Sequence, residues 1–506
     1  MAKIHVSGKP ESYWIATTSK GTDFPKLEKE VEVDVAIVGG GMAGITAAYL
    51  LKQEGKKVAL IEADKIGHGV TGNTSAKITS LHTLIYKYLI DHFGKEGAKQ
   101  YAKAQESAIA RIMEIIEKEK INCDFVKADA YTYTGTKENI SKLKEEAQVA
   151  KNLGLPASYT DIVPLPYPAY GAVKFTNQAH FHPLKYLMKL VEKIPGKGSY
   201  IFENTRIQDI KKGSPAEIIA LDNKKIKAKY VIVTTNYPIL NDGLYYARLT
   251  PSRSYVIAAR ISEHIPKGMF INIEEPLYSL RPQITEDAQC LIVTGFEHVT
   301  GQEEDTARYY VELEKMTRAR FAVESVDFHW STQDPVTIDG VPFIGKYTPD
   351  SENIFVATGF GGWGMTNGTA AAMILSDMIL KRRNSWAPVF DPARYEQLKS
   401  VTNLLSQNVK VMENFVKGRF SGNEEDVNKL DKGDGKVFQI GKNKVAVYKD
   451  DAGNLHKVSA VCTHMGCVLH FNNAEASWDC PCHGSRFSTE GEVFHGPAID
   501  PLKKIY

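Results

Sequence analysis

The chain has 506 residues, enough for about three domains, and its 43% hydrophobic and 24% charged composition is that of an ordinary globular protein. Its 62 Lys and Arg nearly balance its 60 Asp and Glu, and a net charge of +2 argues against nucleic acid as the main partner, because phosphate binding needs a basic field. Without a long apolar stretch or an apolar N-terminal signal, we expect no membrane span and a cytoplasmic location.

The chain opens with a polar, aperiodic lead-in over residues 1–30, and a βαβ unit follows. A β-branched run at 33–39 ends in glycines, a helical pattern covers 42–54, and 57–62 predicts a second strand. This order is typical of a parallel sheet with helices packed on it.

A glycine pattern lies between the first strand and the helix. Gly39, Gly41 and Gly44 form G-x-G-x-x-G, which permits a tight turn, close approach of a pyrophosphate and close helix packing. Glu62 ends the second strand 18 residues after Gly44, where an acid would accept ribose hydroxyls. We predict dinucleotide binding here, the alternative being a glycine-rich turn in the core.

The middle of the chain alternates helical and strand-like runs. Helices are predicted at 95–120, 141–153 and 306–321, and strands at 230–236, 255–260 and 290–295.

A second glycine-rich turn follows a buried strand predicted at 353–358. Its glycines are Gly359, Gly361, Gly362 and Gly364. They permit close backbone approach, and the helix beginning near Thr366 would direct its N-terminal amides at a bound group. The alternative is a loop that only caps a core helix.

Three stretches resemble the FAD-dependent family of D-amino-acid, glycine and sarcosine oxidases: the first turn with 67–79, the strand at 230–236, and 334–345 with the following glycine-rich turn. The resemblance implies an α/β fold over 31–382, with a Rossmann-like FAD domain and an interleaved α+β substrate lobe mainly within 163–330. Cysteine is absent from 331–338, where some members tether the flavin, so we expect non-covalent FAD.

The same resemblance suggests substrate residues. Tyr278 and Arg281 fall where such enzymes often bind a substrate carboxylate, a task that suits the planar guanidinium of Arg. A surface salt bridge is the alternative for Arg281. Lys77 and His82 follow the flavin-side turn and are expected to face the isoalloxazine ring, although an ordinary structural role is the competing interpretation.

Residues 383–424 are mixed and polar and are interpreted as a connecting arm. From 425 to 506 short strands and glycine turns predict a small all-β module. This module contains the pattern C-x-H-x15-C-x2-H, formed by Cys462, His464, Cys480 and His483. Two cysteines and two histidines can hold a 2Fe-2S cluster or a tetrahedral zinc ion.

The module resembles Rieske 2Fe-2S domains of the cytochrome-complex type. The resemblance implies that Cys462 and Cys480 hold one iron and that His464 and His483 hold the other. It also implies a disulfide between Cys467 and Cys482, a pair that a zinc site does not need. Gly-Pro-Ala at 496–498 resembles the proline loop that shields the cluster.

The hydrogen bonds to the cluster set its expected potential. Ser485 occupies the position whose hydroxyl donates to a bridging sulfur, which raises the potential, whereas Phe487 stands where high-potential members have a tyrosine. We therefore expect a value in the middle of the range of roughly −150 to +300 mV.

The two modules together predict an FAD-dependent oxidoreductase. It would oxidise the C–N bond of an amine or amino acid to an imine and pass electrons through the cluster to an unidentified acceptor. A reductase running the relay in reverse and a non-catalytic redox carrier or sensor are the alternatives. A Rieske oxygenase is disfavoured, because His180, His182, His264 and His298 are scattered and do not form a two-histidine, one-carboxylate iron motif.

Overall fold

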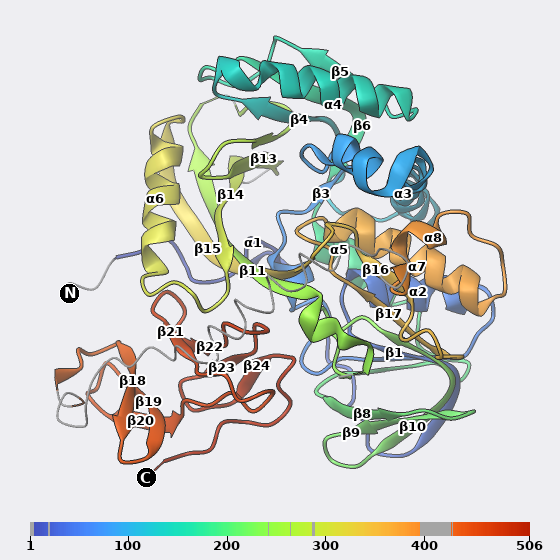
Figure 1. Ribbon diagram of the computed structural model, residues 1–506, viewed down its shortest axis with the longest axis vertical. Helices are drawn as coiled ribbons and strands as arrows, with labels where there is room; N and C mark the ends of the chain where they lie inside the picture. Colours follow the sequence, from blue (N-terminus) through green and yellow to red (C-terminus); the bar gives the residue numbers. More distant parts are fainter. Residues whose placement is uncertain are drawn as a thin grey trace.

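The computed structural model describes residues 5–18, 21–240, 242–263, 265–285, 289–394, 427 and 429–505. These residues form two large sheets with their helices, and two small sheets at the C-terminal end (Figure 1). The arrangement confirms the expected α/β fold with a small all-β C-terminal module. Among the helices of these residues, none is both long enough and apolar enough to cross a bilayer.

The first large sheet has eight strands and contains the predicted βαβ unit. Its main path runs β16-β17-β10-β1-β2-β7, with β8 and β9 attached beside β10. The bounds are β1 Val31–Val38, β2 Val58–Ile61, β7 Tyr200–Phe202, β8 Ile207–Lys211, β9 Ala216–Ala220, β10 Lys225–Val233, β16 Phe343–Lys346 and β17 Ile354–Thr358. The β10, β1 and β2 strands are parallel, so their carboxyl ends meet at one edge.

Two helices that follow glycine turns pack on this sheet and on each other. They are α2 (Met42–Gln53) and α7 (Gly364–Ile379), and both are almost wholly buried. The α5 helix (Pro183–Val191) lies beside α2. The N-termini of α2 and α7 both lie at the carboxyl edge of the sheet, where the predicted dinucleotide turn is.

The second large sheet has nine strands in the path β15-β11-β14-β13-β12-β4-β6-β3, with β5 beside β6. The bounds are β3 Lys77–Ile78, β4 Val126–Thr134, β5 Ala157–Thr160, β6 Gly171–His180, β11 Leu249–Ile261, β12 Met269–Asn272, β13 Tyr278–Ile284, β14 Gln289–Val299 and β15 Val323–Thr337. The α6 helix (Ala307–Arg318) packs against β11 and β14, and α4 (Ile140–Asn152) packs against β5 and β6.

The α3 helix (Ile85–Glu119) starts ten residues before the predicted beginning at residue 95. Gly94 has a non-helical φ of 69° and interrupts it. The segment before Gly94 was not predicted and is anchored by the buried residues Tyr86 and Leu89, and the predicted helix begins directly after the kink. Short helices complete this part of the chain: α1 Tyr13–Ala16, α8 Ala387–Phe390, and the 3-10 turns η1 Val70–Asn73, η2 Lys137–Asn139 and η3 Asp242–Ala247.

The C-terminal module consists of a three-stranded and a four-stranded sheet. The strands are β18 Gly435–Ile440, β19 Asn443–Lys449, β20 Leu455–Ser459, β21 His470–Asn472, β22 Ser477–Asp479, β23 Arg486–Ser488 and β24 Val493–His495. The four-stranded sheet lies between the three-stranded sheet and the rest of the molecule (Figure 1). Of the predicted connecting arm, 395–424 lies outside the described residues.

Candidate functional site

The glycine turn after β1 has no room for side chains. A Cβ on Gly39, whose φ is +112°, would lie 2.4 Å from the carbonyl oxygen of Thr234, and one on Gly44 would lie 2.0 Å from the carbonyl oxygen of Gly39. Gly41 is the N-cap of α2 and makes no side-chain capping bond. The turn thus brings the N-terminus of α2 to the end of the sheet, a position that suits a phosphate group, and the N–H of Met42 there donates to the Thr71 hydroxyl at 3.0 Å.

Glu62 lies directly after β2 and faces this turn. One carboxylate oxygen accepts the N–H of Gly40 at 2.7 Å and the other accepts the N–H of Asp64 at 3.1 Å. Burial is the main cause of a raised pKa for the Glu62 carboxyl.

A large cavity opens in front of the turn, and residues from both parts of the chain line it. Gly39, Gly41, Glu62, Gly362 and Gly364 are predicted cofactor residues on its wall. Gly44 lies behind the turn, and Lys77, Gly359, Gly361 and Thr366 do not line this cavity. The wall of the cavity also includes residues 494–499 of the C-terminal module.

His82 is buried and Lys77 is half-buried, and both already have protein partners. The ammonium group of Lys77 donates to the Phe270 carbonyl oxygen at 3.1 Å and to the Ser279 hydroxyl. Burial, and then the charge of Arg281, lower the pKa of Lys77 to about 7. His82 stacks on the ring of Trp363, with centroids 4.5 Å apart.

Arg281 and Tyr278 lie inside the second large sheet. The guanidinium donates to the carbonyl oxygens of Ser75 and Phe181 and to Gln283 Oε1, at 2.7, 3.1 and 2.8 Å. It also stacks on the ring of Trp14. The surface salt bridge considered for Arg281 is wrong, because the side chain is fully buried. A substrate carboxylate would have to displace these partners, and the role of this pair in substrate binding stays a prediction.

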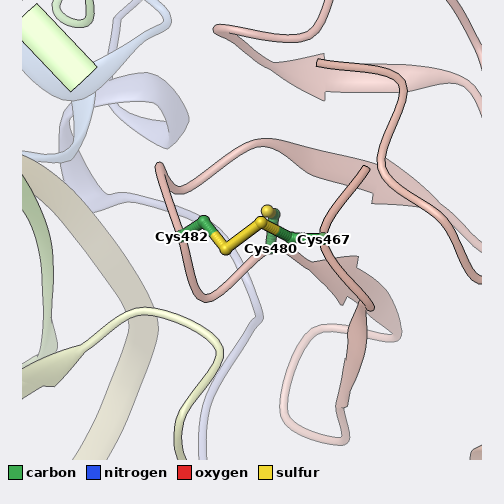
Figure 2. Close-up of side chains that lie close together, drawn as sticks. All are labelled: Cys467, Cys480 and Cys482. Atoms are coloured by element: carbon green, nitrogen blue, oxygen red, sulfur yellow. A yellow bond between two sulfur atoms is a disulfide. The ribbon is translucent and has the colours of Figure 1, made fainter. Parts of the chain in front are cut away.

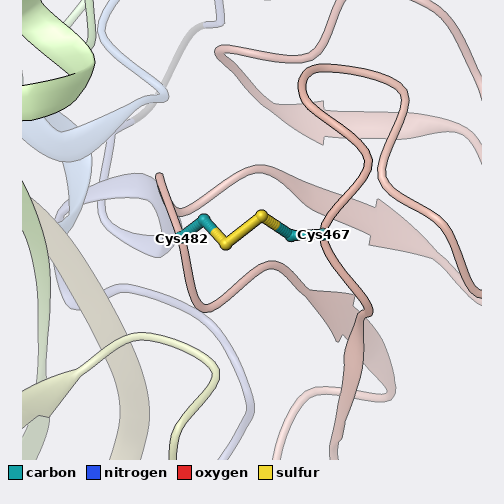
Figure 3. The surroundings of a disulfide bond; sticks show 2 residues. All are labelled: Cys467 and Cys482. Carbon is teal, nitrogen blue, oxygen red and sulfur yellow. A yellow bond between two sulfur atoms is a disulfide. The ribbon is translucent and has the colours of Figure 1, made fainter. Parts of the chain in front are cut away.

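The cysteine loops of the C-terminal module contain the expected disulfide. Cys467 and Cys482 are bonded (Figure 3). Figure 2 shows Cys480 beside them, and the three sulfur atoms lie within 4.8 Å of one another. Since a disulfide consumes two of these sulfurs, Cys480 and the buried free thiol of Cys462 are the available thiolates. Their contact is the largest cause of a lowered pKa at Cys462 and a raised pKa at Cys480.

The two histidines of the motif lie together beside the thiols. Their ring centroids are 5.0 Å apart. Burial lowers the pKa of His464, and burial followed by the charge of His464 lowers the pKa of His483 to about 4, so both rings are neutral at pH 7. Neutral imidazole is the form that binds metal. The Ser485 hydroxyl accepts the N–H of Ala498 at 3.0 Å and hydrogen-bonds Cys462.

His483 faces the larger part of the molecule, whereas His464 is partly exposed. The His483 ring lies 6.0 Å from that of Tyr237 and 6.2 Å from that of Tyr246, between centroids. Both ring nitrogens of His483 are buried, and a hydrogen bond with the backbone of Tyr246 partly opposes the lowering of its pKa. Tyr237 also lines the large cavity, so a single side chain contacts both candidate sites.

Three further cavity residues escaped the sequence analysis: Asn236, Asp334 and His495. Asn236 and Asp334 belong to stretches that carried the family resemblance, but neither position follows from spacing. His495 follows the cluster motif by twelve residues and could not be connected to the first glycine turn by any local pattern.

Comparison with known proteins identifies both parts of the chain. Residues 34–378 match the family model of FAD dependent oxidoreductases, and residues 423–506 match that of the Rieske 2Fe-2S domain. A Bacillus subtilis (strain 168) protein named as a Rieske 2Fe-2S iron-sulfur protein, YhfW, is 38% identical over 100% of this chain and 99% of its own length. Gamma-glutamylputrescine oxidoreductase of Escherichia coli (strain K12) is 23% identical over 73% of this chain and 88% of its own length.

Solved structures agree on the fold of the larger part. Glycine oxidase from Geobacillus kaustophilus aligns with a TM-score of 0.60 at 18% identity, covering 72% of this chain and 99% of that one. L-Proline dehydrogenase from P. horikoshii also aligns with a TM-score of 0.60 at 18% identity, covering 73% and 99%.

The residues present fit both implied cofactors. The cavity offers a glycine turn at a helix N-terminus and an acidic side chain at the end of the adjacent strand, which are the features that a dinucleotide needs. The cysteine loops offer two free thiols and a histidine whose two ring nitrogens are buried. The chain therefore belongs to the FAD-dependent oxidoreductases of the D-amino-acid oxidase type and carries a C-terminal Rieske domain, with FAD and a 2Fe-2S cluster as its cofactors.

Proposed function

We propose that this oxidoreductase oxidises the C–N bond of an amine or amino acid and passes the electrons through its Rieske cluster to an external acceptor. One observation carries the proposal: Tyr237 lines the flavin cavity and lies against His483. A separate electron carrier would have no need of such a contact between the two sites.

The cluster ligands are proposed to be Cys462, His464, Cys480 and His483. The two thiols touch, the two imidazoles are neutral and adjacent, and the neighbouring disulfide joins the loops that hold them. Zinc is disfavoured because a zinc site does not need the disulfide pair Cys467 and Cys482 beside its ligands.

The FAD site is proposed to use the turn of Gly39, Gly41 and Gly44 with the N-terminus of α2 for the pyrophosphate. Glu62 would accept the ribose hydroxyls. On the far side the Gly362 and Gly364 turn and the N-terminus of α7 would direct partial positive charge at the bound flavin. Bound FAD supplies two-electron oxidation of a C–N bond and the cluster supplies one-electron transfer, the resulting imine being hydrolysed by water.

Relatives support the substrate class. One is named for gamma-glutamylputrescine, and structures of the same fold are named glycine oxidase, L-proline dehydrogenase and L-amino acid deaminase. All of these names denote compounds with an oxidisable C–N bond. We propose a small amine or amino acid as the substrate.

Anaerobic mixing of the holoenzyme with a panel of amines and amino acids tests the relay. We expect an active substrate to reduce the flavin absorbance first and the cluster absorbance in a second phase. Tyr237→Leu should slow the second phase and leave the first unchanged, whereas Tyr237→Phe, which keeps the ring, should restore it. Tyr246→Leu is the matched control, because Tyr246 contacts His483 but does not line the cavity.

Other outcomes would select a different function. Reduction of the flavin by reduced cluster, with no amine effective, would show electron flow in the reverse direction. If dithionite reduces the flavin and the cluster but no amine or amino acid does, the protein would be an electron carrier or sensor. Rapid formation of peroxide in air with an unreduced cluster would show an oxidase that does not use the relay.

A further inference from the structure

A segment of the Rieske domain forms part of the wall of the flavin cavity. Residues 494–499 lie on this wall together with Arg206, Asn236 and Tyr237 of the oxidoreductase domain. Phe494 is 58% exposed, an unusual state for a phenylalanine ring, and it borders the cavity. The cavity is thus lined by two domains, and Arg206, Asn236 and Tyr237 precede residue 494 by more than 250 positions in the chain.

Hydrogen bonds fix this segment against the oxidoreductase domain. The amide nitrogen of Asn236 donates to the Gln333 carbonyl oxygen at 3.1 Å and lies 3.2 Å from Nε2 of His495. Since the amide nitrogen is a donor, His495 accepts through Nε2 and carries its proton on Nδ1. Arg206, another wall residue, donates to the Val493 carbonyl oxygen at 3.3 Å.

Other contacts dock the two domains through residues that do not line the cavity. The Asn473 side-chain oxygen accepts the N–H groups of Thr306 and Ala307 at 2.9 and 3.0 Å, and so caps α6 of the oxidoreductase domain. Gly301 packs on the backbone of the second cluster loop, where a Cβ would lie 2.9 Å from the nitrogen of Pro481. Gln333 donates to the Gly484 carbonyl oxygen at 2.8 Å.

We infer that the FAD site is composite: 494–499 of the Rieske domain completes it, and FAD binding and docking of the Rieske domain stabilise each other. Because coupling between two equilibria is reciprocal, docking strengthens FAD binding by the same factor by which bound FAD strengthens docking. A change that populates the undocked state therefore weakens FAD binding, by at most that factor. The inference does not depend on electron transfer, since a composite site would hold FAD whether or not electrons pass to the cluster.

A bulky side chain introduced into the docking surface outside the cavity tests the inference. Gly301→Leu puts a side chain against the second cluster loop. Gly55→Leu is the matched control, because the two glycines have φ values of +73° and +77° and a Cβ on Gly55 meets nothing within 4 Å. We expect Gly301→Leu to raise the FAD dissociation constant about tenfold, a typical coupling, and Gly55→Leu to leave it unchanged. The titration uses apoflavoprotein prepared from the full chain and the fluorescence of free FAD.

Two further measurements separate docking from misfolding. The visible spectrum and paramagnetic signal of the cluster must persist in Gly301→Leu, which shows that the Rieske domain is folded. Hydrogen exchange on the wild-type chain should show slower exchange of the amides of 494–499 when FAD is added, with β19 unchanged as an internal reference. His495→Ala removes a side chain of the cavity wall without adding bulk between the domains, and it should also weaken FAD binding.

Unchanged exchange at 494–499 on addition of FAD would overturn the inference. So would wild-type FAD affinity in both Gly301→Leu and His495→Ala with the cluster intact. Loss of FAD affinity with a normal rate of cluster reduction in the molecules that keep FAD would support the composite site and leave the relay in place.

Discussion

Asp334 is the one carboxylate of β15 on the cavity wall, and its ionisation lies near neutral pH. Burial, followed by the charge of Glu297, raises the pKa of Asp334 to about 7, while a hydrogen bond from the Gly362 backbone acts in the opposite direction. Gly362 belongs to the glycine turn proposed to contact the flavin. The charge of this wall therefore changes in the physiological range.

FAD affinity should consequently depend on pH. Below pH 7 the Asp334 carboxyl is neutral, and above pH 7 it is a carboxylate that repels the anionic pyrophosphate. We expect the FAD dissociation constant to rise between pH 6 and pH 8 by up to about tenfold, the factor that corresponds to one pKa unit. Asp334→Asn should remove the dependence and keep the affinity measured at low pH. A pH profile of the variant that is as steep as that of the wild type would assign the effect to another group.

Single side chains were the hardest feature to predict from the sequence. The ligand motif and the glycine turns could be recognised because their chemistry demands fixed residue types at fixed spacing. Arg281 and Lys77 have no such pattern, and the same residue types serve equally well as buried structural groups. Only the structure shows that Lys77 bonds Ser279 and that Arg281 bonds backbone carbonyl groups.

At the scale of elements, two glycines lie in close contacts of different kinds: Gly44 of α2 packs on the glycine turn after β1, and Gly368 of α7 packs on α2. A Cβ on Gly44 would lie 2.0 Å from a backbone oxygen, whereas one on Gly368 would lie 3.3 Å from the nitrogen of Ala43. The first distance is a clash with rigid backbone, and the second is a tight contact. The turn in front of α2 therefore has no freedom to move away from an added methyl group.

Gly44→Ala should abolish detectable FAD binding and lower the free energy of unfolding by about 1–3 kcal/mol, the usual cost of overpacking a core. Gly368→Ala, in the same helix pair, should keep FAD binding and change stability by less than this. Titration with FAD and urea denaturation followed by circular dichroism measure the two effects. Equal behaviour of the two variants would show that the turn can relax.

Most elements of the oxidoreductase domain follow from hydrophobic periodicity, and the strands at 33–39, 57–62 and 353–358 are found within one or two residues of the prediction. The helix predicted at 95–120 is found after the kink at Gly94, whereas the helical segment before the kink was not predicted. Tertiary packing of Tyr86 and Leu89 stabilises that segment.

At the scale of the whole molecule, the placement of the two domains could not be predicted from the sequence. Each domain resembles a known family, but neither family resemblance contains the surface that joins them. Arg253 on β11 lies 3.0 Å from Glu475 and 3.9 Å from Asp479, which follow it by more than 220 positions. Arg486 bonds the same two carboxylates. No spacing rule connects these residues, and only folding brings them together.

Arg253 is 1% exposed, so its removal leaves two acidic groups in a largely buried interface with only Arg486 to neutralise them. Arg253→Met should weaken docking by about 3–5 kcal/mol, the usual cost of breaking a buried ion pair. Arg260→Met is the matched control, because Arg260 lies on the same strand and pairs with Asp327 within the oxidoreductase domain, but its side chain is 38% exposed.

Urea unfolding is the measurement. The visible absorption of the cluster reports the unfolding of the C-terminal domain, and far-ultraviolet circular dichroism reports the unfolding of the whole chain. We expect Arg253→Met to move the cluster transition to lower urea than the transition of the oxidoreductase domain, whereas Arg260→Met leaves the two transitions as in the wild type. Coincident transitions in Arg253→Met at the wild-type midpoint would mean that the buried charges do not hold the domains together.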